Sequence, residues 1–317
     1  MKIGYFLSSE EFDPRDLVDQ ARRAEAAGFH ALWISDHYHP WIDAQGNSPF
    51  VWSVLGAVAQ VTERVHVLTG VTCPTMRIHP AIVAQAAATT ACMMPGRFAL
   101  GVGTGENLNE HILGDRWPAA DERLEMLQEA VRVMRLLWEG GTKTHRGPHY
   151  TVENARLYNL PDEPIEVMVA ASGQSAIDAA GRIGDGLVSL APMPHIVESF
   201  ERAGGEGKPT YAETHCCYGR DEAEMRKVAA KQWPITGVKG QLPQELALPS
   251  FFEQASDPVD EESATAHVAC GDDPDRHIEE INNFVEAGFD HVWVHNIGPN
   301  QEGFFDFYAD EVLPKLR

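Results

Sequence analysis

The segment Ser35–Trp41 reads Ser-Asp-His-Tyr-His-Pro-Trp and brings histidines, a carboxylate and aromatic rings together in a short stretch. It directly follows the apolar run 31–34, a predicted strand, and barrel enzymes carry their catalytic groups at the carboxyl ends of such strands. Histidine exchanges a proton near neutral pH, and Asp36 or a carboxylate from elsewhere in the pocket could set the tautomer of His37. We therefore expect His37 to act as a general acid or base.

The same segment allows a different chemistry. His37 and His39 form the His-x-His pair that opens the metal sites of barrel hydrolases, whose remaining ligands follow later strands. His215 and His295 are candidates for those ligands, but they do not complete a recognisable set. The sequence therefore favours proton chemistry at His37 and predicts no metal site, with a metal-dependent barrel hydrolase as the alternative.

A glycine-rich segment, Gly101–Glu110, follows the predicted strand 98–102. Its Gly-x-Gly-x-Gly spacing departs from the Gly-x-Gly-x-x-Gly of dinucleotide-binding folds, and the carboxylate of Glu106 at the turn would repel a pyrophosphate. Glycines at this place can instead form a floor under a flat ring, with Glu106 at its edge. This segment therefore points away from NAD(P) as the cofactor.

Two further segments follow predicted strands. Residues 69–77 include residue types that tolerate a strained backbone or the close approach of another group. Without the other motifs, this segment would be interpreted as an ordinary loop. Residues 167–176 end a strand and begin a helix, whose free N–H groups could hold a phosphate. Both segments are candidates for ligand-binding loops.

Strands and helices alternate along almost the whole chain, which is typical of a parallel sheet covered by helices. The stretch Ala27–Ile34 resembles Ala287–Val294, and each follows an amphipathic helix. Such equivalent units early and late in the chain predict a (β/α)8 TIM barrel, with an open doubly wound sheet as the alternative. Residues 234–268 lack periodicity and are interpreted as a loop insertion. No segment resembles an interdomain linker, so we expect one domain over residues 1–317.

Composition limits the partners. The 317 residues include 47 Asp and Glu against 25 Lys and Arg, and the net charge of −22 should repel nucleic acid and anionic membranes. No apolar run approaches the roughly 18 residues of a membrane helix, and the first residues resemble a strand rather than a signal peptide. The 5 cysteines show no Cys-x-x-Cys spacing, which suits a reducing cytoplasm. We expect a cytoplasmic enzyme with a small-molecule substrate.

Taken together, these motifs resemble the deazaflavin-dependent branch of the bacterial-luciferase-like superfamily, which includes sugar-phosphate and secondary alcohol dehydrogenases that use coenzyme F420. The similarity covers nearly the whole chain. It is carried jointly by the motifs at 35–41, 72–85 and 101–110 and by the turn Gly184–Gly186. The resemblance implies an F420-dependent dehydrogenase acting on a CH–OH group, and a homodimer, since dimers are usual in that branch.

The resemblance also implies roles for individual residues. His37 would take the hydroxyl proton of the substrate while hydride moves to the deazaflavin, Glu106 would exchange a proton near a ring nitrogen, and Trp41 would pack on the substrate. A non-prolyl cis peptide is expected at Gly70–Val71. The residues expected to contact the coenzyme are Asp36, Gly70, Val71, Cys73, Thr104, Gly105, Asn109, Ser172, Gly173, Ser175 and Ala176.

One departure from the branch concerns the substrate. Where the sugar-phosphate enzymes hold the phosphate with two lysines and an arginine, this chain has Met193, Pro243 and, approximately, Ala266, although Lys239 or a nearby arginine could replace them. We therefore expect a non-phosphorylated secondary alcohol as substrate. The alternatives are a glucose 6-phosphate dehydrogenase using F420 and an FMN-dependent luciferase-like monooxygenase.

Overall fold

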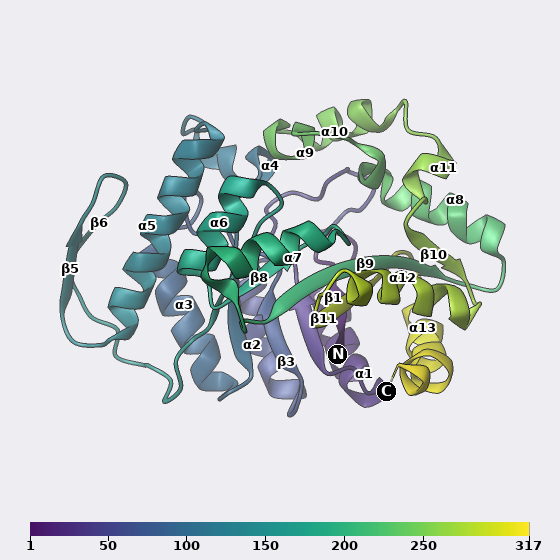
Figure 1. Ribbon diagram of the computed structural model, residues 1–317, viewed down its shortest axis with the longest axis horizontal. Coiled ribbons are helices and arrows are strands. Elements are labelled where there is room, and N and C mark those ends of the chain that lie inside the picture. The colour runs from purple at the N-terminus through teal and green to yellow at the C-terminus, as the bar shows by residue number, and fades with distance from the viewer. Residues whose placement is uncertain (317) are drawn as a thin grey trace.

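The computed structural model describes residues 1–316, and its centre is a ring of parallel strands (Figure 1). Within this range the ring consists of eight strands: β1 (Lys2–Leu7), β2 (Ala31–Ile34), β3 (His66–Thr69), β4 (Phe98–Val102), β7 (Val167–Ala170), β8 (Gly186–Ser189), β9 (Thr210–Tyr218) and β11 (His291–Asn296). β8 pairs with β9, and β11 pairs with β1, where Lys2 lies opposite His291. The ring is therefore closed, which confirms the predicted barrel and excludes the open sheet.

Helices connect the strands and cover the outside of the barrel (Figure 1). The principal ones are α1 (Pro14–Ala27), α2 (Val51–Val61), α3 (Pro80–Met93), α5 (Ala120–Trp138), α6 (Gln174–Ile183), α7 (Pro194–Phe200), α8 (Glu222–Gln232), α12 (Pro274–Glu286) and α13 (Gln301–Phe307). Short helices and helical turns are α4 (Asn107–Glu110), η1 (His111–Leu113), η2 (Glu201–Gly205), η4 (Tyr308–Val312) and η5 (Leu313–Lys315). In the described part of the chain, no helix combines the length and the apolar character needed to cross a bilayer.

Alternation along the strands separates two apolar layers. Residues such as Tyr5 and Leu7 pack outward against the helices. Phe6 points inward and belongs to a separate cluster of inward-pointing residues from several strands: Phe6, Ala31, Trp33, Leu68, Met168, Val188 and Trp293. The inward indole of Trp33 is accommodated because Gly70 opposite it has no side chain, and a Cβ atom there would overlap the ring. The barrel is thus filled by side chains.

The repeated sequence near the two ends of the chain forms the same turn twice. Gly28 after α1 and Gly288 after α12 both adopt left-handed conformations, with φ of 97° and 96°. In each turn the next phenylalanine donates its backbone N–H to a carbonyl five residues earlier at 3.1 Å, Phe29 to Ala24 and Phe289 to Phe284. The structure therefore confirms the two stretches as equivalent helix-to-strand units.

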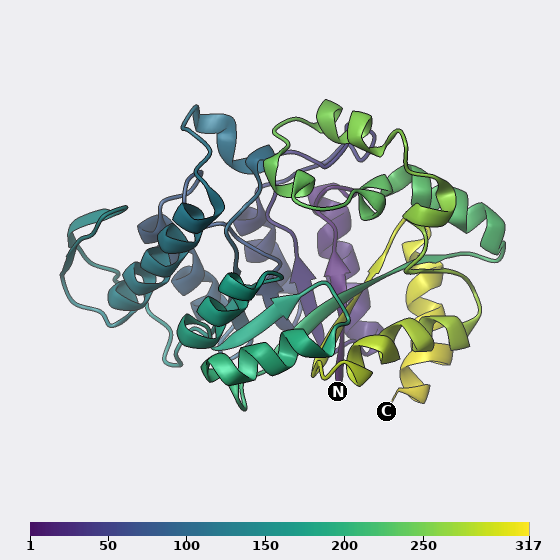
Figure 2. The same cartoon turned by 45° about the horizontal axis from the view of Figure 1, so that its top comes forward.

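Two regions add to the barrel. A hairpin of β5 (Lys143–Arg146) and β6 (Thr151–Ala155) projects at one side (Figure 1). Its strands are polar and mostly exposed, so the sequence has no apolar alternation that would predict them. Residues 234–264 form η3 (Pro234–Gly237), α9 (Leu242–Glu245), α10 (Pro249–Ser256) and α11 (Glu261–Ala264), and β10 (Val268–Gly271) follows and pairs with β9. Figure 2 shows these short helices together at one end of the molecule.

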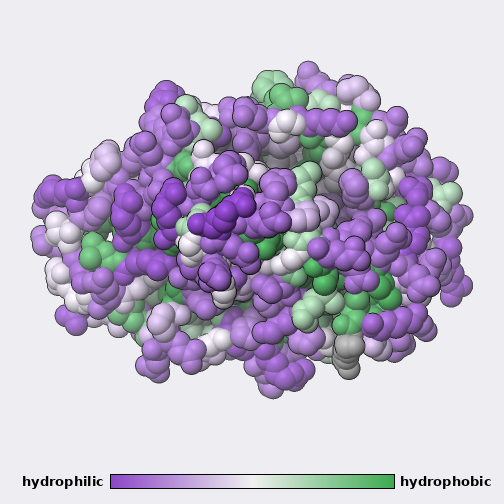
Figure 3. All heavy atoms as spheres, viewed as in Figure 1, coloured by the Kyte–Doolittle hydropathy of each residue, from purple (hydrophilic) through white to green (hydrophobic). Residues whose placement is uncertain are grey.

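The face drawn in Figure 3 is mainly hydrophilic, with small apolar areas interrupted by polar residues. This agrees with the excess of acidic side chains in the sequence.

Candidate active site

The polar segments that follow β1, β2, β3 and β4 meet at the carboxyl end of the barrel. Asn109 of α4 connects two of them, because its side-chain oxygen accepts hydrogen bonds from the backbone N–H groups of Tyr38 (2.8 Å) and His39 (3.2 Å). Its amide nitrogen donates to Oε2 of Glu106 at 3.3 Å. The structure thus brings the histidine segment and Glu106 to the same side of the barrel, linked through one buried asparagine.

His37 is held from both ring nitrogens. Its Nδ1 donates to the backbone oxygen of His39 at 3.1 Å, because a carbonyl oxygen can only accept. Its Nε2 lies 3.4 Å from Oε1 of Glu10, whose side chain is 2% exposed. The hydroxyl of Ser35 donates to Oε2 of the same carboxylate at 2.7 Å. A neutral His37 therefore presents an unprotonated Nε2 that can take a proton, and Glu10 is placed to stabilise the resulting cation.

Glu10 is a residue of the candidate site that sequence reasoning missed. The carboxylate expected beside His37 was Asp36 or one from elsewhere in the pocket, and the structure places Glu10 there. The signal was available, since Ser8-Ser9-Glu10-Glu11 is a polar run directly after the first strand, at the end where barrels carry catalytic groups.

Trp41 packs against His37 and against the short helices of residues 234–264. The ring centroids of Trp41 and His37 are 4.8 Å apart, and those of Trp41 and Phe252 of α10 are 5.2 Å apart in a T-shaped arrangement. The backbone N–H of Trp41 donates to the side-chain oxygen of Gln45 at 2.9 Å. The indole is half-buried, so it forms a wall beside the histidine.

Asp36 belongs to a buried ion network rather than to His37. Its carboxylate accepts from Nη2 of Arg77 at 2.9 Å and from the hydroxyl of Thr72 at 2.8 Å. Glu110 accepts from the backbone N–H of Arg77 at 2.8 Å. Burial raises the pKa of Glu110 to about 7, against the opposing effect of Arg77. This network fixes the loops after β2, β3 and β4 relative to one another.

The peptide bond Gly70–Val71 is cis, as the resemblance implied. Gly103 lies close to it, since a Cβ atom on Gly103 would come within 2.8 Å of a methyl group of Val71. Gly105, with φ of 79°, approaches Cys73, and a Cβ atom there would lie 2.6 Å from its sulfur. Burial raises the pKa of the Cys73 thiol well above its usual value, so this residue fills space as a neutral group.

No side chain caps the first backbone N–H groups of α6. Gly173 is the N-cap residue of this ten-residue helix and makes no side-chain cap. Ser172, Gly173 and Ser175 are exposed, and Ala176 and Thr104 are half-buried. The arrangement can accept an anionic group at the positive end of the helix.

The histidines of the His-x-His pair each use one nitrogen on the backbone, because Nδ1 of His39 donates to the oxygen of Leu108 at 2.9 Å. Their expected partners lie elsewhere. His215 on β9 and His295 on β11 contact each other, with ring centroids 5.3 Å apart, and both face Glu213. The structure therefore does not combine His37, His39, His215 and His295 into one set of ligands.

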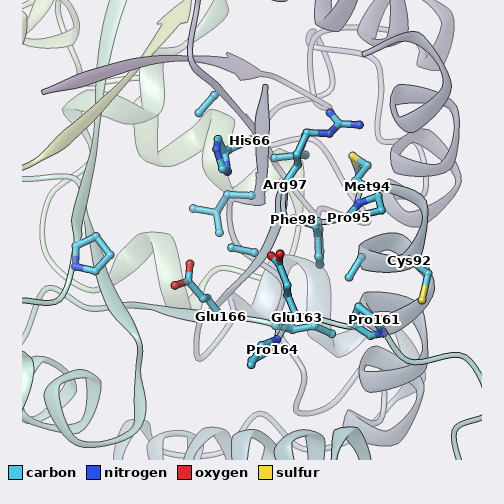
Figure 4. Close-up of a pocket in the computed structure, with 18 of the residues that line it drawn as sticks. His66, Cys92, Met94, Pro95, Arg97, Phe98, Pro161, Glu163, Pro164 and Glu166 are labelled. Atoms are coloured by element: carbon cyan, nitrogen blue, oxygen red, sulfur yellow. The ribbon is translucent and has the colours of Figure 1, made fainter. Parts of the chain in front are cut away.

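A cavity of about 910 Å³ opens at the opposite end of the barrel (Figure 4). Its lining includes His66, Arg97, Glu163 and Glu166, which lie at or before the starts of β3, β4 and β7. Barrel enzymes carry their chemistry at the carboxyl ends of the strands. We therefore place the candidate active site around His37 and not in this cavity.

Comparison with known proteins places this arrangement in a family. The profile of the luciferase-like monooxygenase family matches residues 1–291. A glucose-6-phosphate dehydrogenase described as F420-dependent, from Beutenbergia cavernae, is 36% identical over 329 residues, covering 100% of this chain and 98% of that protein. A protein of the same description from Nakamurella multipartita is also 36% identical, with 100% and 97% covered.

Among solved structures, an F420-dependent secondary alcohol dehydrogenase in complex with an F420–acetone adduct superimposes with a TM-score of 0.93 at 32% identity. The match covers 100% of this chain and 99% of that protein. The family profile covers most of the chain, and the solved structure shares its fold. The chain belongs to the luciferase-like monooxygenase family.

Proposed function

We propose that this chain is an oxidoreductase that moves a hydride between coenzyme F420 and the carbinol carbon of a non-phosphorylated secondary alcohol. The two dehydrogenases and the alcohol dehydrogenase structure described above are named as F420-dependent, which supports this coenzyme for the present chain. When bound, the deazaflavin ring supplies the hydride acceptor or donor, and the protein supplies orientation and proton transfer.

The pair His37 and Glu10 carries the proposal. Oxidising an alcohol to a ketone releases the hydroxyl proton as the hydride leaves carbon, so a base must lie beside the hydroxyl. Nε2 of a neutral His37 carries no hydrogen and can take that proton, and the carboxylate of Glu10, 3.4 Å away, stabilises the imidazolium that forms. In the reverse direction the same imidazolium returns the proton to the ketone oxygen.

Several features of the carboxyl end fit a flat ring with an anionic side chain. Gly103, whose missing Cβ leaves room near Val71, and the Gly70–Val71 peptide would support the ring, and the open start of α6 would receive a phosphate group. The residues proposed to contact the coenzyme are Asp36, Gly70, Val71, Cys73, Thr104, Gly105, Asn109, Ser172, Gly173, Ser175 and Ala176.

Glu106 and Trp41 complete the proposed centre. Glu106 is half-buried, and Asn109 orients its carboxylate, so it can exchange a proton with the coenzyme ring. Trp41 holds an apolar wall next to His37, which suits the alkyl groups of a secondary alcohol.

The proposed preference for an alcohol without a phosphate group rests on two positions. At these positions the related sugar-phosphate enzymes carry residues that bind the phosphate. Met193, the N-cap of α7, is 50% exposed and uncharged, and Pro243 lies in α9. A phosphate needs charge-assisted hydrogen bonds to replace its water. The 36% identity to proteins named as glucose-6-phosphate dehydrogenases supports sugar-phosphate oxidation as the second candidate.

Coenzyme binding is tested by fluorescence titration of the purified chain with F420, FMN and NADP. We expect saturable binding of F420 alone. Tight binding of FMN without F420 would favour a monooxygenase, and binding of NADP without F420 would overturn the proposal.

The substrate is tested by comparing kcat/KM for 2-propanol and glucose 6-phosphate with saturating F420. Each lost charge-assisted contact costs about 1.5–3 kcal/mol, so missing two should disfavour the sugar phosphate by roughly two to four orders of magnitude. A sub-millimolar KM for glucose 6-phosphate would contradict the proposed substrate, and Lys239 and Arg202 would be the first cations to replace. In either case His37→Ala should lower kcat by roughly 10²–10⁴-fold while F420 binding persists.

A further inference from the structure

Three potential metal ligands meet inside the barrel, apart from the residues of the proposed hydride transfer. Glu213 and His215 lie on the inward face of β9, and His295 lies opposite His215 on β11 (strands labelled in Figure 1). Oε1 of Glu213 is 3.5 Å from Nδ1 of His215 and 3.7 Å from Nδ1 of His295. All three ligand atoms lie within 4.8 Å of one another.

These separations suit a shared ion better than direct hydrogen bonds. Zinc binds imidazole nitrogen and carboxylate oxygen at about 2.0–2.2 Å, so two ligands on a tetrahedral ion lie about 3.3–3.5 Å apart. Neither Nδ1 atom has a hydrogen-bond partner, although both are buried from solvent. Buried polar atoms are normally paired, and an ion at the centre of the three ligands would satisfy both nitrogens at once.

An outer carboxylate sets the tautomer of a neutral His295. Nε2 of His295 donates to Oε2 of Glu11 at 2.6 Å, and the other oxygen of Glu11 accepts from the backbone N–H of Gly298 at 3.3 Å. Since the hydrogen of a neutral ring is then on Nε2, the lone pair is on Nδ1 and points toward Glu213. A carboxylate behind a histidine in this way is the usual second layer of a metal site.

The surroundings are consistent with a bound cation. His295 is 1% exposed and packs against Phe6 and Trp233, with ring centroids at 4.9 and 4.6 Å. Its side-chain neighbours from β9, β1 and the loop after β1 are acidic or neutral: Glu213, His215, Phe6, Glu10 and Glu11. The side chain of His215 is 22% exposed, which gives an ion a way in.

We propose that Glu213, His215 and His295 bind one divalent transition-metal ion of the zinc type, with Glu11 as the outer carboxylate. Two imidazoles and one carboxylate are ligands that zinc prefers, and three protein ligands leave a coordination position for water. The site does not depend on F420 or on the proposed substrate.

The test uses the full chain after treatment with a chelator. Isothermal titration with Zn²⁺ and visible absorption with Co²⁺ should both show one equivalent bound, and Zn²⁺ should raise the temperature of unfolding. His215→Ala and Glu213→Gln should abolish the tight equivalent and the Zn²⁺-dependent stabilisation. Glu11→Gln should keep the stoichiometry but weaken binding by about 10–100-fold.

Two histidine variants serve as controls. His39→Ala removes a member of the His-x-His pair, and His267→Ala removes an exposed histidine outside the cluster, so both should bind metal like the original chain. The proposal is overturned if the original chain binds no equivalent of Zn²⁺ or Co²⁺, or if folded His215→Ala and Glu213→Gln bind as tightly as it does. Loss of binding only in His39→Ala would move the site to the His-x-His pair and equally refute the proposal.

Discussion

Replacing Glu10 with glutamine tests how the proposed base works. The substitution keeps the shape of the side chain, but it removes the negative charge 3.4 Å from Nε2 of His37. A hydrogen bond to a charged group contributes about 1.5–3 kcal/mol, and each 1.36 kcal/mol corresponds to a factor of ten in rate. Since the imidazolium forms only as the proton leaves the substrate, Glu10→Gln should lower kcat/KM for the alcohol by roughly 10- to 150-fold.

The assay is steady-state F420 reduction with 2-propanol at pH 7, together with a fluorescence titration of the coenzyme. The dissociation constant of F420 should change less than about threefold, because a carboxylate beside His37 is proposed to act on the substrate side. Asp16→Asn, on the exposed start of α1, is the matched acidic control and should leave both quantities unchanged. If Glu10→Gln reduced F420 at the original rate, the proposed role of the pair would be wrong.

Three further substitutions have defined outcomes. Phe252→Ala should lower the free energy of unfolding by about 3–5 kcal/mol, because the residue is fully buried; urea unfolding measures this. It should also reduce kcat/KM in steady-state kinetics, because the ring of Phe252 packs against Trp41. Ser175→Asp places a carboxylate at the start of α6 and should weaken F420 binding roughly tenfold or more, whereas Ser175→Ala should have a small effect. Burial lowers the pKa of His277 to about 4, so the unfolded chain takes up a proton between pH 6.5 and 4 that the folded chain does not, and stability falls as the pH decreases through that range. In His277→Gln this fall should be smaller, by on the order of 2–3 kcal/mol, when urea unfolding at pH 7 and pH 4.5 is compared.

The barrel could be predicted from sequence because its signals are local. Apolar runs such as 31–34 and 98–102 mark strands, and the repeated Ala-Gly-Phe turn marks equivalent units at both ends of the chain. Once the strands are assigned, the rule for parallel barrels places His37 and Glu106 at the same end. The placement of His37 and Glu106 at one end of the barrel could therefore be predicted from the sequence pattern.

Features that depend on side-chain approach across the barrel could not be predicted in this way. Glu10 and His37 follow different strands, and only the closed ring brings the carboxylate to Nε2. His215 and His295 were recognisable as possible ligands, yet His295 meets Glu213 and His215 only because β11 pairs with β9 in this register. The strands of the β5–β6 hairpin are polar and lack an apolar alternation, so the sequence pattern did not predict them.

The pairing of β1 with β11 has a consequence for the synthesis of this chain on the ribosome. Lys2 lies opposite His291, so β1 has no permanent neighbour on one side until nearly all the other strands have been made. An unpaired strand edge can join other chains, and contacts between distant parts of a sequence form slowly. During translation β1 is therefore the strand in greatest need of protection, and a chaperone that holds β1 would increase the yield of folded protein more than one that acts on β11.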